Sequence, residues 1–306
     1  MEFEWKGVMP ALTTKFDEAD NLDLDLFDKN VRAQLDAGVS GLILGGTLGE
    51  ASTLEPQELK ALTQKAIETA RGSVPVILNV AEGGTRRALQ AVKTAESCGA
   101  DGLMLLPPMR YKPTGLETET YIREIAGSTD LPIMVYNNPV DYGTEVTLDM
   151  FESLMADCPN IQAVKESTRD VSNVTRIRNA FGDRLKILCG VDTLALESLA
   201  MGADGWVAGL VCAFPRETVA VYALAKAGHM EAALAIYRWF LPLLELDINP
   251  QLVQNIKLAE KMVGLGSEVV RKPRLPLSGA ERQRVIGIVE EGLKLRPDLP
   301  EYLKFI

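Results

Sequence analysis

The hydrophobic and polar positions of this chain alternate on two length scales. Short, mostly apolar runs are separated by longer segments in which apolar residues recur with a helical spacing. This alternation is typical of consecutive strand and helix units around a parallel sheet. Eight such runs can be counted, and eight parallel strands close a barrel. We expect strands at residues 8–12, 41–45, 74–80, 102–106, 131–136, 161–165, 185–189 and 205–210.

A weak internal repeat supports this interpretation. Residues 37–44, 98–105 and 201–208 share a pattern in which one glycine is followed by a second glycine that opens an apolar run. The first glycine of each copy, at Gly38, Gly99 and Gly202, falls where a helix needs a left-handed residue at its end. The repeat therefore predicts three helix-to-strand turns.

After residue 210 the alternation stops. Segments 219–227, 230–246, 252–263 and 281–294 all have helical patterns, and no strand pattern lies between them. We therefore predict an α/β protein, a (β/α)₈ TIM barrel over residues 1–228 followed by a C-terminal helical domain over residues 229–306.

Composition narrows the possible partners. The chain has 306 residues, 47% of them hydrophobic, and a formal net charge of −10, which argues against nucleic acid. An apolar run of membrane-spanning length and the apolar core of a signal peptide are both missing, so we expect no membrane partner. The four cysteines are widely spaced and form no Cys-x-x-Cys pair, which favours a cytoplasmic location.

The titratable residues also exclude several kinds of site. The only histidine, His229, lies between two predicted helices of the C-terminal domain, which argues against a histidine metal site and against a Ser-His-Asp triad. Asp192 and Glu82 each follow a predicted strand, but two distant carboxylates do not define a cation site. We predict no metal and no separate cofactor.

Lys165 ends the sixth apolar run, at the carboxyl edge where an eight-stranded barrel carries its active site. An ammonium buried there loses water, and this desolvation lowers its pKa towards the range where the free amine exists near neutrality. A free amine can attack a carbonyl carbon. The alternative is a lysine that leaves the sheet and extends to solvent.

Three further groups follow other predicted strands. The glycine-rich segment 45–50 carries Thr47 and exposed amides that could hold a carboxylate, although an ordinary turn is also compatible with it. Tyr136, with Asn138 close behind it, could move protons or could simply be a core aromatic residue. Arg110 could clamp a carboxylate or remain in solvent.

Lys165, Tyr136 and the segment 46–50 occur in the order and spacing of the dihydrodipicolinate synthase and N-acetylneuraminate lyase superfamily, which this chain resembles over nearly its whole length. The resemblance implies a (β/α)₈ enzyme, often a homotetramer, that forms a Schiff base with pyruvate or a related 2-oxo acid. It implies that Lys165 forms the imine and that Tyr136 relays protons. It further implies that Thr47 and the Leu48 amide hold the substrate carboxylate, and that the Val207 carbonyl lines the pocket.

Three departures from the family pattern concern the substrate. Leu48 replaces the second of two hydroxyl residues, Asp141 stands where a synthase carries an arginine, and Arg110 replaces a tyrosine. A carboxylate at residue 141 would repel an anionic aldehyde, whereas it could meet a hydroxyl or a charged imine. Asn138, Asp141 and Arg110 are therefore candidate substrate-binding residues.

These departures favour a Schiff-base lyase that eliminates a small group. The family members that this pattern resembles most are deaminases of 1-pyrroline-4-hydroxy-2-carboxylate, and 2-keto-3-deoxy sugar acid dehydratases or aldolases come next. Two alternatives remain open, a 4-hydroxy-tetrahydrodipicolinate synthase and a barrel that binds a metabolite without catalysis.

Overall fold

The computed structural model describes residues 3–108 and 111–306. Its sheet has eight parallel strands in the order β1-β8-β7-β6-β5-β4-β3-β2. The strands are β1 (Gly7–Pro10), β2 (Leu42–Leu44), β3 (Val76–Val80), β4 (Gly102–Leu105), β5 (Ile133–Asn137), β6 (Ile161–Glu166), β7 (Lys186–Cys189) and β8 (Gly205–Ala208). Each falls within or beside a predicted apolar run, so the barrel prediction is confirmed.

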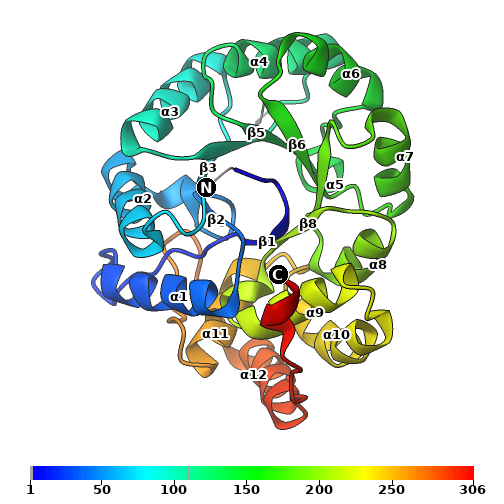
Figure 1. The fold of residues 1–306 in the computed structure, drawn as a ribbon. Coiled ribbons are helices and arrows are strands. Elements are labelled where there is room, and N and C mark those ends of the chain that lie inside the picture. Colours follow the sequence, from blue (N-terminus) through cyan, green and yellow to red (C-terminus); the bar gives the residue numbers. More distant parts are fainter. Residues whose placement is uncertain (1–2, 109–110) are drawn as a thin grey trace.

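The sheet closes on itself at its two ends. β1 pairs with β8 over four residues. Its other side meets β2 through the bridge between Ala11 and Ile43 and a 2.9 Å hydrogen bond from the Leu12 amide to the Ile43 carbonyl. Figure 1 shows the strands as a central ring surrounded by helices. Because all strands are parallel, their carboxyl ends meet at one mouth of the barrel.

Helices alternate with the strands around this ring and then continue alone. They are α1 (Leu24–Ala37), α2 (Pro56–Ala70), α3 (Thr85–Cys98), α4 (Gly115–Ala126), α5 (Pro139–Tyr142), α6 (Leu148–Asp157), α7 (Ser172–Phe181), α8 (Ala195–Ala200), α9 (Pro215–Lys226), α10 (Met230–Leu244), α11 (Leu252–Met262) and α12 (Gly279–Lys294). Short 3₁₀ turns occur at η1 (Ala51–Thr53), η2 (Asp192–Leu194), η3 (Leu210–Cys212) and η4 (Tyr302–Phe305).

The predicted helix-to-strand turns are present at all three glycines. Gly38, Gly99 and Gly202 have φ values of 90°, 80° and 102°, in the left-handed region that L-residues with a side chain rarely adopt. The Gly38 and Gly99 amides close the ends of α1 and α3 by donating to carbonyls of the last helical turn. Glycine therefore recurs at these three turns because the backbone there adopts a left-handed conformation.

The core has two layers because successive side chains of a strand point to opposite faces of the sheet. In β3, Ile77 lies in the inner layer, whereas Val76 and Leu78 pack against the helices. The inner layer consists of Trp5, Met9, Ile43, Ile77, Met104, Met134, Ala163, Leu188 and Val207. It fills the barrel, so an open cavity can form only at a mouth.

The C-terminal helices are tied to the barrel. α9 packs against β1 and α1, and Figure 1 shows α10, α11 and α12 together on one side of the ring. Two buried ion pairs connect α11 to the barrel, Lys257 to Glu50 at 2.6 Å and Glu260 to Lys15 at 2.7 Å. The domain boundary at residue 228 stays a prediction. Within the described ranges, every helix is too short or too polar to cross a membrane.

Candidate active site

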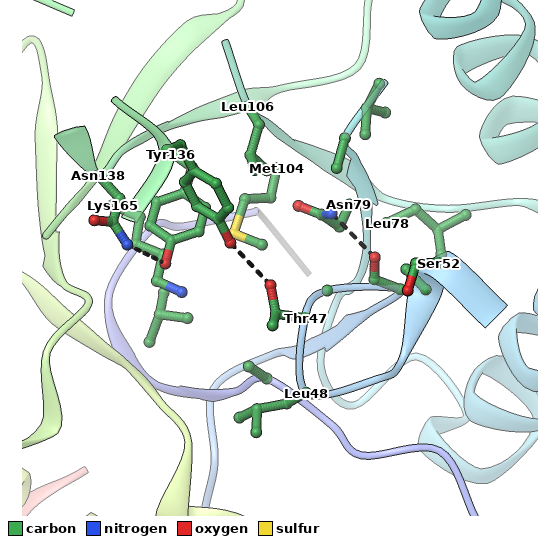
Figure 2. Close-up of a pocket in the computed structure, with 18 of the residues that line it drawn as sticks. Thr47, Leu48, Ser52, Leu78, Asn79, Met104, Leu106, Tyr136, Asn138 and Lys165 are labelled. Atoms are coloured by element: carbon green, nitrogen blue, oxygen red, sulfur yellow. Dashed lines mark hydrogen bonds between the residues drawn. The ribbon is translucent and has the colours of Figure 1, made fainter. Parts of the chain in front are cut away.

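A cavity of about 930 Å³ opens where the strands end, which is within the size range of small-molecule sites. Figure 2 shows Lys165, Tyr136 and Asn138 at one side of this cavity and Ser52 at the other. The structure brings together these predicted site residues in its wall: Thr47, Leu48, Tyr136, Asn138, Asp141, Lys165 and Val207. Arg110, the remaining candidate, lies outside the described residues.

Lys165 sits on β6 directly beside Tyr136 on β5, because the two residues are register partners in neighbouring parallel strands. Its exposed fraction is 7%, and its Nζ lies 4.0 Å from the centroid of the Tyr136 ring. Gly190 makes room for it, since a Cβ at that position would lie 2.6 Å from the Lys165 Cε. Burial lowers the pKa of Lys165, while the carboxyl groups of Asp247 and Asp192 oppose that shift.

Tyr136 presents the face of its ring to the Lys165 ammonium. Burial raises the pKa of its hydroxyl to about 12, so the phenol stays protonated at neutral pH. The hydroxyl accepts a 3.0 Å hydrogen bond from the Asn138 Nδ2. Its ring also packs edge-on against Tyr142, with ring centroids 5.6 Å apart. Asn138 and Tyr142 therefore fix the position of a protonated phenol in the same cavity as Lys165.

The glycine-rich segment after β2 forms a tight turn at the mouth. Gly45 has φ 71°, and the Ala51 amide donates back to the Gly46 carbonyl at 3.3 Å. Within residues 3–108 and 111–306, no acceptor bonds to the amides of Thr47 and Leu48. Free amides that neighbour one another in a turn can bind an anion such as a carboxylate. Glu50 ends the turn, and Lys257 holds its carboxylate.

Tyr142 is a functional candidate that sequence reasoning missed. Its hydroxyl lies 2.9 Å from the Thr47 Oγ1, and burial raises its pKa. Leu48, beside Thr47, replaces a hydroxyl residue of the family pattern. The structure instead supplies a hydroxyl from the end of α5, six residues after Tyr136. The sequence offered one signal, a second tyrosine close behind Tyr136. The direction of the Tyr142 side chain, however, depends on the short helix α5, which the sequence did not predict.

Asp141 lies in the wall as predicted, but it is not an isolated anion. Its carboxylate accepts 2.8 Å and 3.2 Å hydrogen bonds from the Asn138 Nδ2 and the Arg169 guanidinium. Both members of the Asp141–Arg169 pair are about half exposed, so solvent screens their charges. Arg169 therefore brings a positive charge to the same wall, and the expected repulsion of an anionic partner stays a prediction.

Asp192 has a different environment from that of Asp141. It is buried and accepts hydrogen bonds from the Trp206 indole at 2.9 Å and the Leu210 amide at 2.8 Å, with the Gly209 amide as a third donor. Burial raises the pKa of Asp192, and these donors together with Lys165 counteract the shift. Its hydrogen bonds fix the turn after β8.

The chain is similar to known proteins over nearly its whole length. Residues 4–292 match the model of the Dihydrodipicolinate synthetase family. The chain belongs to this family. It is 35% identical over 276 residues to a 4-hydroxy-tetrahydrodipicolinate synthase of Exiguobacterium sibiricum, an alignment that covers 89% of this chain and 92% of the relative.

Solved structures of the family have the same fold. Dihydrodipicolinate synthase from Aquifex aeolicus aligns with a TM-score of 0.88 and 27% identity over 94% of this chain and 98% of its own. The chloride-inhibited synthase from Acinetobacter baumannii, complexed with pyruvate, aligns with a TM-score of 0.87 and 27% identity, again over 94% and 98%. This is a family of class I lyases and aldolases, for which pyruvate-dependent Schiff-base chemistry is typical, so the chain is an enzyme of that class.

Other residues at the site also escaped sequence reasoning. Gly190 and Gly209 follow β7 and β8 and leave space for neighbouring side chains. Asp247 reaches the cavity from the turn between α10 and α11. A sequence argument that searches only the strand ends has no reason to select a residue of the C-terminal helices.

Proposed function

We propose that this enzyme is a Schiff-base-forming lyase of small 2-oxo acids or their cyclic imines. One observation carries the proposal: a buried amine with a lowered pKa, Lys165, lies beside the protonated phenol of Tyr136 in a cavity. Lys165 attacks the carbonyl or imine carbon, and Tyr136 moves the protons. Thr47 and the Leu48 amide hold the substrate carboxylate.

The preferred reaction is elimination of a small group, and the preferred substrate is 1-pyrroline-4-hydroxy-2-carboxylate, which would be deaminated. The groups that raise the pKa of Lys165 against its burial include the Tyr142 hydroxyl and the Asp247 and Asp192 carboxyl groups, and Arg169 already pairs with the Asp141 carboxylate. Such a wall suits a hydroxyl or an imine better than a second carboxylate. A 2-keto-3-deoxy sugar acid has the same features, so its dehydration or aldol cleavage belongs to the same proposal.

A 4-hydroxy-tetrahydrodipicolinate synthase is the second candidate. Curated relatives at 35% and 34% identity carry that name. Arg169 supplies a cation where the sequence indicated only an anion, and it could receive the carboxylate of an aldehyde partner if its pair with Asp141 opened. This observation makes the synthase a stronger alternative than the sequence did.

The Schiff base is tested by trapping. Borohydride added with pyruvate should reduce the imine, and peptide mass spectrometry should locate the added mass on Lys165. Lys165→Ala should form no adduct and lose turnover, whereas Lys186→Ala, at a partly exposed lysine outside the cavity, should behave like the unmodified protein. A protein that binds pyruvate but forms no adduct would be a metabolite-binding barrel.

Direct competition between the two reactions separates the substrates. Ammonia release from 1-pyrroline-4-hydroxy-2-carboxylate and water release from 2-keto-3-deoxy sugar acids are compared with condensation of pyruvate and aspartate semialdehyde. We expect kcat/KM for a release reaction to exceed that for condensation by at least roughly tenfold, which is ~1.4 kcal/mol of transition-state stabilisation. The reverse order would make the protein a synthase.

The proposal also includes the oligomeric state of the enzyme and its location in the cell. The family resemblance suggests a homotetramer, which sedimentation velocity would measure. The four cysteines are all free and buried, which supports the expectation of a reducing cytoplasm.

A further inference from the structure

A carboxyl group from the C-terminal part of the chain enters the cavity. Asp247 lies in the turn between α10 and α11 and lines the same cavity as Lys165. In the described part of the chain, its carboxyl group takes part in no hydrogen bond or ion pair with another side chain. Asp141, which also lines the cavity, and the buried Asp192 are both bonded to donors.

The position of Asp247 is built into the fold. Its flanking residue Leu246 is buried, and the Leu246 carbonyl accepts a 3.1 Å hydrogen bond from the Asn255 side chain of α11. The carboxyl packs against Gly209 at the end of β8. A Cβ at residue 209 would lie 2.3 Å from the Asp247 Oδ1, so only glycine leaves room for the carboxyl group there.

The surroundings of Asp247 favour its protonated form. Burial and then the charge of Asp192 raise the pKa of Asp247 well above its usual range, with Asp141 adding to the shift and Lys165 opposing it. Asp192 receives donors that stabilise its charge, whereas none of the described residues donates to the Asp247 carboxyl group. When neighbouring carboxyl groups have such different environments, one serves as the anion and the other as the acid.

We propose that Asp247 is the general acid that protonates a hydroxyl group leaving from C4 of the Lys165-bound substrate. This inference rests on the proposed lyase function and deepens it, because it defines the substrate class as 4-hydroxy-2-oxo acids or their cyclic imines. Tyr136 acts at C2 and C3, and Asp247 supplies a second acid on the cavity wall for the leaving group at C4.

For a 2-oxo acid, each step balances. Lys165 adds to C2, and the C2 hydroxyl leaves as water with the proton of Tyr136, which yields a protonated imine and a phenolate. The phenolate removes a proton from C3. The resulting enamine expels the C4 hydroxyl, which takes the proton of Asp247 and leaves as water, and a C3–C4 double bond forms. Water then adds to C2 and returns its proton to Asp247, and the C2–N bond breaks to free Lys165 and the product.

A matched pair of substrates tests this role. 4-Hydroxy-2-oxopentanoate and 4-chloro-2-oxopentanoate give the same product, 2-oxopent-3-enoate, but chloride leaves without a proton. In Asp247→Asn we expect kcat for the hydroxy substrate to fall ~10²-fold or more, the scale of general acid catalysis, and kcat for the chloro substrate to change less than about threefold. Glu245→Gln, at an exposed acid of the same turn, should leave both unchanged.

Two further measurements keep the test decisive. Gly209→Ala, which displaces the Asp247 carboxyl group, should show the same selective loss. The borohydride adduct with pyruvate should persist in Asp247→Asn, which shows that the variant is folded and that Lys165 is intact.

The outcomes separate the two proposals. Equal losses for both leaving groups, no loss for either, or a rise in KM alone would overturn the acid role of Asp247. A wild-type protein that forms the adduct but never releases water from the hydroxy substrate would overturn it too, and would leave the Schiff base standing. A wild-type protein that forms no adduct would overturn the proposed function and, with it, the inference.

Discussion

Lys165 owes its chemical character to two opposing effects on one ammonium group. Desolvation disfavours the charge, and the nearby carboxyl groups favour it, but the net pKa is lowered because burial is the larger effect. Among the described residues, no carboxylate forms an ion pair with Lys165, and the Tyr136 ring is its cation–π partner. A buried ammonium without an ion pair weakens the folded state, so it is retained for another reason.

The lowered pKa predicts the pH dependence of adduct formation. Only the free amine attacks, and a lowered pKa means that the amine becomes free at a lower pH. The rate of pyruvate adduct formation should therefore rise with pH and reach half its maximum below ~10.4, the value of an ordinary lysine. Stopped reactions with borohydride between about pH 6 and pH 11 measure this profile. A midpoint at or above the ordinary value would contradict the desolvated amine. Lys165→Met should be at least as resistant to urea as the unmodified protein.

At the scale of elements, α5 is the short helix that aims Asp141 and Tyr142 at the cavity. Asn138 begins it, because its Oδ1 accepts a 3.1 Å hydrogen bond from the Asp141 amide. The same side chain donates to the Tyr136 hydroxyl at 3.0 Å. Asn138 therefore couples the helix start to the proton donor of β5.

Substitutions at Asn138 should separate these two roles. Asn138→Ser keeps an oxygen that can begin the helix but loses the amide that reaches Tyr136. We expect kcat to fall about tenfold, from one lost hydrogen bond of ~1.4 kcal/mol, with a smaller change in unfolding free energy. Asn138→Ala should lower the unfolding free energy by about 1 kcal/mol more, because the helix cap is also lost. Steady-state kinetics and urea unfolding measure both. A fully active Asn138→Ser would show that the Tyr136 contact is dispensable.

At the scale of the whole molecule, the C-terminal helices contribute to the site. Lys257 and Glu260 of α11 are fully buried and pair with Glu50 and Lys15 of the barrel. Glu50 also accepts a 3.0 Å hydrogen bond from the Arg271 amide, and it ends the turn that carries Thr47. The C-terminal part of the chain therefore holds this turn through Glu50 and also supplies Asp247 to the cavity wall.

This coupling predicts a large effect of Glu50→Gln on stability. The substitution leaves the Lys257 ammonium buried without its anion, which should lower the free energy of unfolding by about 3–5 kcal/mol. Glu68→Gln removes a carboxylate that is 71% exposed and should change it by less than about 1 kcal/mol. Denaturant unfolding compares the two variants. Adding Lys257→Met to Glu50→Gln should recover stability, and equal effects of Glu50→Gln and Glu68→Gln would contradict the coupling.

The sequence by itself determined the barrel and the meeting of Lys165 with Tyr136. Apolar runs and helical periodicity report which face of each segment is buried, and parallel strands necessarily end at the same mouth. Two residues at the ends of consecutive strands therefore become neighbours, as the register of β5 and β6 records. The glycines of the repeated turns were predictable for the same local reason.

Only the tertiary structure decided the remaining contacts of the site. Tyr142 meets Thr47 across 95 positions of sequence, and Arg169 meets Asp141 across 28. Asp247 reaches the cavity because Gly209 leaves space for it. Periodicity describes the faces of regular elements and does not describe the paths of the loops between them. These contacts depend on where loops from distant elements converge, and that is set by the packing of the whole chain.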